Sequence, residues 1–474
     1  MKTYTKNLFR LPALIAGLGL IPVDRVTAQT FTTLHKFTSV SGPSATNSDG
    51  FDPVAGLILS GNTLYGTASR GGSSGYGTVF KINTDGTGFT TLHSFTGFPN
   101  GTNSDGAYPV AELILSDDTL YWTANRGGSS GNGTVFRVNT DGAGFTNLHS
   151  FAYDSDGSEP VGGLLLSANT LYGTAVFGGS GAGTVFAVNT DGTGFTNLHS
   201  FTGGSDGGSP AAGLISSGNT LYGTAGRGGN SGYGTVFAVN TNGTDFTNLY
   251  SFTVGSGNIF SSYTNSDGVN PRGLILLGNT LYGTASAGGS SGAGTVFAVN
   301  TGGTGFTNLH SFTGGSDGAK PYAGLILSGN ALYGTAGGTV FAINTDGTGL
   351  TTLHSFNNDG GTPTARLILS GNTLYGTTRD EGSSMGGTVF SLSFAPQLAI
   401  SLSGANVVLT WPTHVAGFDY TGFTLQFTTN LVSPAFWCPV SPAPLVINGQ
   451  NTVTNRISGT QQYYRLSQLI IVGE

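Results

Sequence analysis

Cysteine and charge are both scarce in this chain of 474 residues. The single cysteine, Cys438, excludes an intramolecular disulfide, so packing must stabilise the fold. Only 8% of the residues are charged, and the net charge of −7 is scattered mostly over Asp-Gly turns. No basic face suited to phosphates is evident, so we expect no nucleic-acid partner.

Long apolar runs are also missing, except near the N-terminus. Residues 1–28 contain Lys2, Lys6 and Arg10, then LPALIAGLGLIPV, then the small-x-small tripeptide that ends at Ala28. This order predicts a signal peptide cleaved near Ala28 and a secreted or cell-surface protein, the alternative being a buried N-terminal helix. No later segment reaches ~20 consecutive apolar residues, so we expect no transmembrane span.

Glycine, by contrast, is abundant, with 81 residues, and apolar residues still make up 37% of the chain. A disordered chain would lack the Leu, Val, Phe and Tyr that recur here, so the glycine indicates many tight turns. The sequence repeats itself from Phe31 to Phe394 with a period of about 50 residues, which is typical of propeller blades rather than of short solenoid coils.

Each repeat contains four strand-like runs. In the fourth copy these are residues 213–217, 220–225, 234–240 and 246–252, which are rich in β-branched and aromatic residues. Gly218-Asn219 separates the first two runs and suits a tight hairpin turn. Runs such as TVFAV are apolar at consecutive positions, so both faces of each small sheet must be buried.

The repeats begin and end out of step, and this offset predicts a closed ring. A lone fourth strand, residues 31–37, precedes the first set, whereas the last set ends at residues 387–393 without a fourth strand. Pairing the two would complete every blade, and an open array would leave an orphan strand. We therefore expect an all-β, seven-bladed β-propeller over residues 29–394, closed by strand 31–37; an elongated or irregular β-array is the alternative.

The repeat resembles a known family. The phrase LHSFTGGSDGAKPYAGLILSGNALYGTAGGTVFAINTDG, residues 309–347, is similar to the GloVer tandem repeat of exported bacterial choice-of-anchor proteins, and all seven copies carry it. The resemblance implies an exported, propeller-like protein. It implies no catalytic residues.

The period stops at Ala395, so residues 395–474 are predicted to form a separate small β-sandwich. VVLTWP and YYRL resemble the fibronectin type III-like modules of exported bacterial proteins, which bind, space or anchor. We expect Trp411, Leu425, Trp437 and Tyr464 to be its buried anchors.

Strand alternation places the variable loops on one side of the ring and the uniform tight turns on the other. Variable loops on a rigid scaffold commonly carry binding sites. Arginines that suit a sugar or an anionic polymer occur there together with aromatic residues, and the alternative is that all of them are solvated loop residues. The candidate ligand-binding residues are Arg70, Arg126, Arg227, Tyr76, Trp122, Phe177 and Tyr233.

Other constellations predict no catalytic or metal site. Six histidines share one repeat position, but equivalent positions lie far apart around a propeller, so we expect a structural role. GGSSG lies between β-strands and lacks the strand-to-helix turn of a nucleophile elbow. Asp154, Asp156 and Glu159 lack the full ligand set of a calcium loop. We assign no metal and no cofactor.

Two functions remain open. The first is an exported, non-enzymatic binding or surface protein, expected to be a monomer, that presents the loop face to a glycan, a cell-surface polymer or a protein. The second is a polysaccharide-active hydrolase or lyase with a carboxylate pair formed by Glu112 and Asp117 or Asp118, residues that depart from the repeat only in the second copy. A purely structural role in the cell envelope is also compatible with all of these sequence features.

Overall fold

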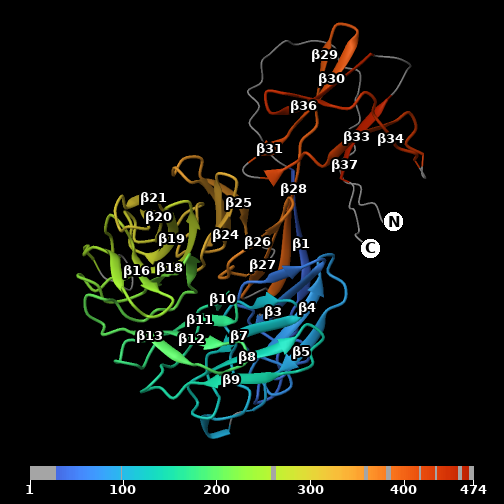
Figure 1. Cartoon of the computed structure of the whole chain (residues 1–474). Coiled ribbons are helices and arrows are strands. Elements are labelled where there is room, and N and C mark those ends of the chain that lie inside the picture. Colours follow the sequence, from blue (N-terminus) through green and yellow to red (C-terminus); the bar gives the residue numbers. More distant parts are fainter. Residues whose placement is uncertain are drawn as a thin grey trace. The chain divides into compact units, whose positions relative to one another are not determined.

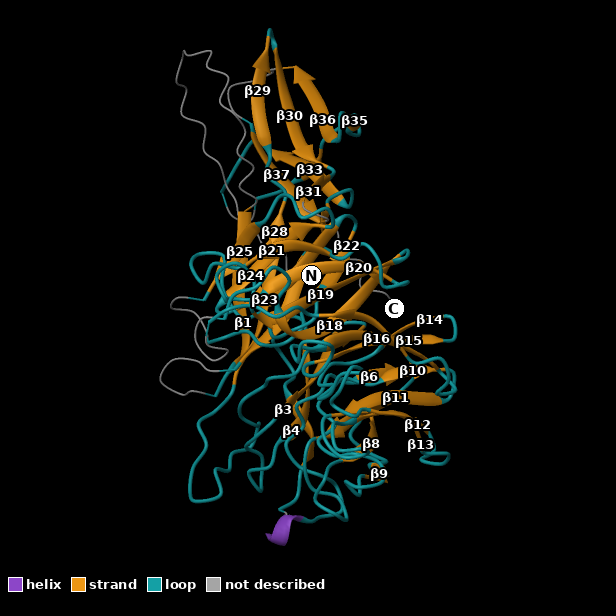
Figure 2. Cartoon of the chain, turned by 90° about the vertical axis from the view of Figure 1, so that its left-hand side faces the viewer, coloured by secondary structure: helices purple, strands orange, loops and turns teal. Residues whose placement is uncertain are grey.

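The computed structural model describes residues 28–97, 99–257, 263–356, 361–379, 386–415, 418–432, 435–456 and 462–468. Within these residues all regular elements are strands except a short 3-10 turn at Pro99–Gly101 (Figure 2). The expected signal peptide lies outside the described residues, apart from Ala28. The chain divides into two compact units, of which one contains residues 32–369 and 374–391 and the other includes the C-terminal sheets.

In the part that the structure describes, seven four-stranded antiparallel sheets form the blades of the first unit. The first strands of the blades are β2 (Ile58–Ser60), β6 (Ile114–Ser116), β10 (Leu165–Ser167), β14 (Ile215–Ser217), β18 (Val269–Leu277), β22 (Ile326–Ser328) and β26 (Ile368–Ser370). The second strands are β3 (Thr63–Ala68), β7 (Thr119–Ala124), β11 (Thr170–Ala175), β15 (Thr220–Ala225), β19 (Thr280–Ala287), β23 (Ala331–Ala336) and β27 (Thr373–Thr378). The third strands are β4 (Thr78–Asn83), β8 (Thr134–Asn139), β12 (Thr184–Asn189), β16 (Thr235–Asn240), β20 (Thr295–Asn300), β24 (Thr339–Asn344) and β28 (Thr388–Ala395). The fourth strands are β5 (Thr90–Ser94), β9 (Thr146–Ser150), β13 (Thr196–Ser200), β17 (Thr247–Ser251), β21 (Thr307–Ser311), β25 (Thr351–Ser355) and, in blade 7, β1 (Ala28–Lys36).

The N-terminal strand completes the last blade. The strand order of blade 7 is β1-β28-β27-β26, and Figure 1 shows β1 in blue beside β28 and β27 in orange. The backbone N–H of Phe37 donates to the carbonyl of Gly387 at 3.1 Å, and the Phe37 ring is fully buried in a cluster with Leu57 and Val389. The prediction of a closed, seven-bladed all-β propeller is therefore confirmed.

A threonine in the second strand of every blade also links that blade to the next one. Its side-chain oxygen donates to a backbone carbonyl near the start of the next blade's first strand, as Thr123 does to Pro160 at 2.9 Å. The last link runs from Thr377 to Ala55 at 3.0 Å and closes the ring. The other donors are Thr67, Thr174, Thr224, Thr284 and Thr335. Each such hydrogen bond contributes about 0.5–1.5 kcal/mol, so the seven together resist opening of the ring.

Local sequence explains the strand boundaries. The turn between the first two strands of blade 4 places Gly218 at a φ of 58°, and Asp117 takes the same position in blade 2 with a φ of 48°. Asp117 is therefore a turn residue. The third strand of blade 4 begins at Thr235, one residue later than the predicted segment 234–240, because Gly234 has a φ of 109°.

The C-terminal unit contains two larger sheets that share a small core. One sheet has the order β29-β30-β36-β35, the other β34-β33-β37, and β31 pairs with β32. Their bounds are β29 (Ala399–Ser403), β30 (Asn406–Pro412), β31 (His414–Val415), β32 (Phe418–Asp419), β33 (Phe423–Thr428), β34 (Cys438–Pro439), β35 (Leu445–Ile447), β36 (Gln450–Arg456) and β37 (Tyr463–Gln468). Trp411 and Leu425 are buried as expected. Trp437 is wrong as a core anchor: it is half-buried beneath the Arg465 guanidinium, which lies 4.3 Å from its ring centroid.

Candidate functional site

Two sets of residues form the edge of the loop face, the side that carries the loops between strands 2 and 3 and between successive blades. In the first set, Arg70 and Arg126 form isolated backbone bridges with Phe51 and Ala107. Each residue of the second set precedes a proline, and four of the six directly follow a bridge partner of the first set. We call the two sets the rim: Arg70, Arg126, Phe177 and Arg227, with Asp52, Tyr108, Glu159, Ser209, Asn270 and Lys320.

The second set of rim residues has an unusual but uniform backbone. All six have φ between 50° and 63°, a region that residues other than glycine rarely adopt. Each donates its N–H to a carbonyl of the preceding blade, as Tyr108 does to Tyr76 at 2.9 Å. The backbone is thus fixed from blade to blade, whereas the side chains differ at every step.

Two arginines and two tyrosines of the rim and its neighbouring loop lie together at blades 1 and 2. The rings of Tyr76 and Tyr108 meet edge to face, with centroids 5.6 Å apart. Burial raises the pKa of Tyr108 and the Tyr76 hydroxyl adds to the rise, whereas the positive charges of Arg70 and Arg126 act in the opposite direction. Backbone bridges join Gly71 to Tyr76 and Ala107 to Arg126, so each arginine lies in the loop beside one of the two tyrosines. We call Arg70, Tyr76, Tyr108 and Arg126 the Arg–Tyr patch.

A carboxylate lies close to each arginine of the patch. Arg126 pairs with Glu159 at 2.5 Å, and Arg70 approaches the Asp52 carboxylate at 4.0 Å. Asp52 also accepts a hydrogen bond from Arg379 of blade 7 at 3.0 Å. The guanidinium-bearing side chains of Arg70 and Arg126 stay about half exposed, at 58% and 49%. They are therefore oriented by their partners yet open to a ligand.

The structure separates the other predicted site residues from this patch. Phe177 lies at the rim position of blade 3 and is 37% exposed, and Arg227 is exposed at blade 4. Tyr233 stacks on Tyr263 with centroids 4.7 Å apart. Trp122 is wrong as a loop-face residue: it lies in the middle of β7, where the other blades have glycine, and is fully buried against Phe136.

Tyr108 is the residue that the sequence prediction missed. It precedes Pro109 at a position that differs in every blade, so no repeated signal singles it out. The available signal was the loop itself, because a large aromatic residue beside a proline in a variable loop seldom serves the core.

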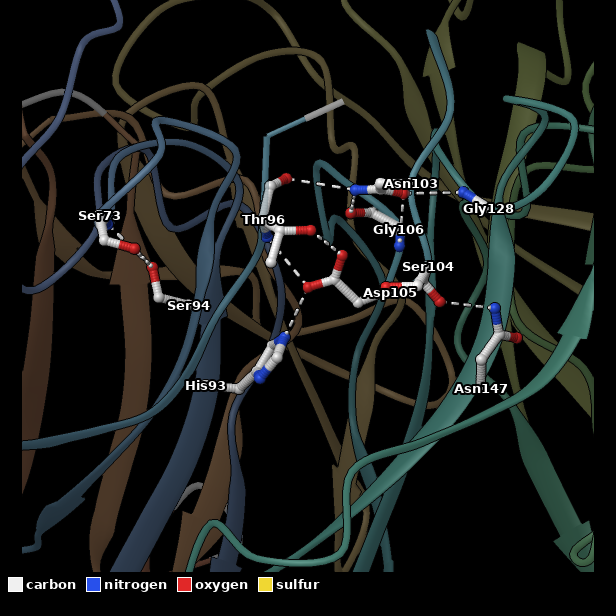
Figure 3. Close-up of polar contacts among 10 residues, drawn as sticks. All are labelled: Ser73, His93, Ser94, Thr96, Asn103, Ser104, Asp105, Gly106, Gly128 and Asn147. Carbon is white, nitrogen blue, oxygen red and sulfur yellow. Dashed lines mark hydrogen bonds and ion pairs between the residues drawn. The ribbon is translucent and has the colours of Figure 1, made fainter. Parts of the chain in front are cut away.

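In the loops that lead to the rim, a hydrogen-bond cluster recurs in six of the connections between blades. Figure 3 shows it for Asp105, whose carboxylate accepts hydrogen bonds from His93 Nε2 at 3.1 Å, from the Thr96 N–H at 2.9 Å and from the Thr96 hydroxyl. The Asn103 side-chain oxygen accepts from the N–H groups of Gly106 and Gly128, both at 2.9 Å. We call the aspartate with its His and Thr donors a latch. Two latches differ in one donor: Tyr250 replaces the histidine beside Asp267, and Ala152 replaces the threonine beside Asp156. The further latch aspartates are Asp49, Asp156, Asp206, Asp267 and Asp317.

The latches also join neighbouring blades through aromatic stacking. The His93 ring stacks on Phe145 of the next blade with centroids 4.2 Å apart and planes 10° from parallel, and His199 stacks on Phe246 at 3.6 Å. In the residues that the structure describes, no group of three or more His, Cys, Asp or Glu could hold a metal ion. Five of the histidines each donate one hydrogen bond to a latch aspartate: His35, His93, His149, His199 and His310.

The latches shift the pKa values of their members. Burial alone would raise the pKa of Asp105, but hydrogen bonds from His93 and Thr96 outweigh it and hold the pKa below its usual range. The same balance lowers the pKa of Asp206. Burial lowers the pKa of His149 and His199, and their aspartate partners oppose this only in part. The folded state therefore favours neutral His149 and His199 and ionised Asp105 and Asp206.

The carboxylate pair expected for an enzyme does not form. Glu112 lines the central cavity and pairs with Arg366 at 2.9 Å. Asp117 and Asp118 lie in the turn beyond β6, on the opposite side of the ring, and five residues of extended chain from Glu112 to Asp117 span about 16 Å. Among the described residues that line the cavity, Glu112 is the one carboxylate. The expected pairing with Asp117 or Asp118 is therefore wrong, because the strand directs them to opposite ends.

Fold and loops together define a closed seven-bladed β-propeller with a varied rim on one face. The model of the Gloeobacter/Verrucomicrobia repeat matches residues 23–181, 154–268 and 254–400. The chain belongs to this repeat family.

Solved structures with a similar fold are distant in sequence. Oligogalacturonate lyase in complex with manganese is 10% identical, with a TM-score of 0.49, over 78% of this chain and 98% of that chain. A chain of the mitotic checkpoint complex is 16% identical, with a TM-score of 0.49, over 82% and 99%. A chain of the nidogen/laminin complex is 15% identical, with a TM-score of 0.39, over 58% and 90%. No curated protein matches the chain.

Proposed function

We propose that this chain is an exported, non-enzymatic binding protein whose Arg–Tyr patch binds a glycan. The observation that carries the proposal is the pair of half-exposed arginines, Arg70 and Arg126, in the loops that also bring the rings of Tyr76 and Tyr108 together. Tyrosine rings offer flat apolar surfaces to sugar rings, and guanidinium groups donate paired hydrogen bonds to hydroxyl or carboxylate oxygens.

The two ends of the chain fit the same role. Residues 1–28 have the pattern of a signal peptide, and the C-terminal unit, which we propose to be a fibronectin type III-like module, would space or attach the propeller. We propose that the mature protein acts as a monomer outside the cytoplasm. In the described residues no helix has the length and apolar character needed to cross a membrane.

Polysaccharide pull-down and a glycan array test the proposal. The mature chain should retain at least one glycan, and the Arg70→Ala/Arg126→Ala double variant should lose more than about 90% of that binding, the loss expected when two charge-assisted contacts disappear. Arg227→Ala is the matched control. Arg227 has the same backbone position in blade 4, but the second-set rim residue of the next loop is Asn270, where Arg70 has Tyr108. Binding by the double variant at the wild-type level, or no retention of any glycan by the wild type, would refute the proposal.

A further inference from the structure

The first strands of the propeller surround a central cavity. Its volume is about 210 Å³, and residues of all seven blades line it. In the sequence, the lining residues come shortly after the rim residues, as Glu112 comes after Tyr108. None of them belongs to the Arg–Tyr patch. The cavity is therefore a separate candidate site.

Two of the three charged lining residues neutralise each other. Arg366 of blade 7 pairs with Glu112 of blade 2 at 2.9 Å, across the intervening blade 1. Glycine at position 56 makes room for this pair, because a Cβ atom there would lie 2.7 Å from Glu112 Oε1. Glu112 and Arg366 thus add no net charge to the cavity.

The third charged residue, Arg272, forms no ion pair with any carboxylate of the described residues. Its Nε is buried and has no hydrogen-bond partner among the described residues, and its guanidinium lies 5.4 Å from the ring centroid of Tyr322. Burial lowers its pKa, and the Tyr322 hydroxyl opposes that shift only in part. The Thr364 hydroxyl, also in the lining, is likewise buried and has no partner in the described part of the chain. An unpaired buried charge is costly, so an anion at this point would stabilise the protein.

We infer that the central cavity binds one small hydroxylated monocarboxylate, with Arg272 holding the carboxylate and Tyr322 and Thr364 contacting the hydroxylated end. The lining carries one uncompensated positive charge, which a monoanion balances and a dianion would exceed. The planar guanidinium donates two parallel hydrogen bonds to a planar carboxylate. A cavity of about 150 Å³ holds benzene, so this one has room for a ligand somewhat larger than a benzene ring.

Calorimetric titration of the Arg70→Ala/Arg126→Ala variant tests the inference, because the loop face cannot contribute in that background. The probes are glucuronate, glucose as its neutral analogue, and inorganic phosphate. Glucuronate should saturate one site per chain, glucose should bind at least about tenfold more weakly for want of the charge-assisted bond, and phosphate should bind more weakly than glucuronate. No binding of glucuronate, or equal binding of glucose, would overturn the inference, and so would tighter binding of phosphate.

Two further substitutions separate this site from a merely structural role. Arg272→Gln should abolish glucuronate binding without lowering the melting temperature, because it removes an unpaired charge. Glu112→Gln should tighten glucuronate binding by about tenfold, because it frees Arg366 and removes the one negative charge of the lining. Unchanged affinity in the Glu112→Gln variant, or full affinity in Arg272→Gln, contradicts the inference. Loss of glycan binding by the loop face leaves these results unaffected.

Discussion

The latches and the rim lie a few residues apart in the same loops, yet they follow opposite patterns. The latch around Asp105 recurs around Asp49, Asp206 and Asp317 with the same His and Thr donors. The rim residue three positions after Asp105 is Tyr108. At this position the side chain differs in each of six blades, although the backbone angle φ stays between 50° and 63°. Side chains repeat where hydrogen bonding and packing between blades require them, and they vary where the backbone alone maintains the structure.

The largest expected effect concerns the closure of the ring. Phe37, contributed by the N-terminal segment, should be as important as its equivalent Phe95 in blade 1, since both are fully buried. We expect Phe37→Ala and Phe95→Ala each to lower the free energy of unfolding by about 3–5 kcal/mol in urea denaturation. A loss for Phe37→Ala below about 1 kcal/mol, beside a full loss for Phe95→Ala, would show that the ring is open in solution.

The latches come next. Asp206→Ala leaves His199 and Thr202 without their acceptor, and we expect a loss of about 2–3 kcal/mol by the same measurement. Asp154→Ala, an exposed aspartate in an equivalent loop, is the control and should change stability by less than about 0.5 kcal/mol. Equal effects of the two substitutions would contradict a structural role of the latch.

Acid should weaken the latches in two steps. The pKa values of His149 and His199 are lower in the folded protein than the usual 6.5, so the unfolded chain binds more protons and stability falls as the pH drops below about 6.5. The pKa values of Asp105 and Asp206 lie below the usual 3.8, so a second loss follows as the pH falls below about 4. Urea midpoints measured from pH 8 down to about pH 2.5 should decline in both ranges, and a flat profile between pH 7.5 and 5 would contradict the first step.

Blade 4 supplies a substitution that sharpens this test. Tyr250 takes the place of the histidine there and donates to Asp267 at 2.8 Å. His199→Tyr should therefore keep the latch at neutral pH while reducing the decline between pH 6.5 and 5 by a few tenths of a kcal/mol. A decline identical to that of the wild type would assign the pH dependence to other groups.

The sequence sufficed for the features that repeat. The offset between the lone strand at residues 31–37 and the incomplete last set predicted the closure by β1, and the hairpin turns predicted the strands to within about two residues. The same repetition predicted that the histidines have a structural role, because six of them share one position of the repeat.

Features that join different copies could not be read in advance. The ring of Tyr108 meets the ring of Tyr76 because blades 1 and 2 are adjacent, and no spacing in the sequence encodes that contact. Trp122 was misplaced because it lies close to Arg126 in sequence, whereas its position within β7 buries it. The pairing of Glu112 with Arg366 spans blade 1 and depends on the ring being closed.

The most direct test compares stability with glycan binding in two variants. Arg70→Ala/Arg126→Ala should lose glycan binding while its free energy of unfolding changes by less than about 0.5 kcal/mol, because both side chains are half exposed. Asp206→Asn, a latch variant remote from the patch in sequence, should lose about 1–2 kcal/mol of stability and keep its glycan affinity. The reverse result, a rim variant that unfolds more easily but binds normally, would contradict the division between latch and rim.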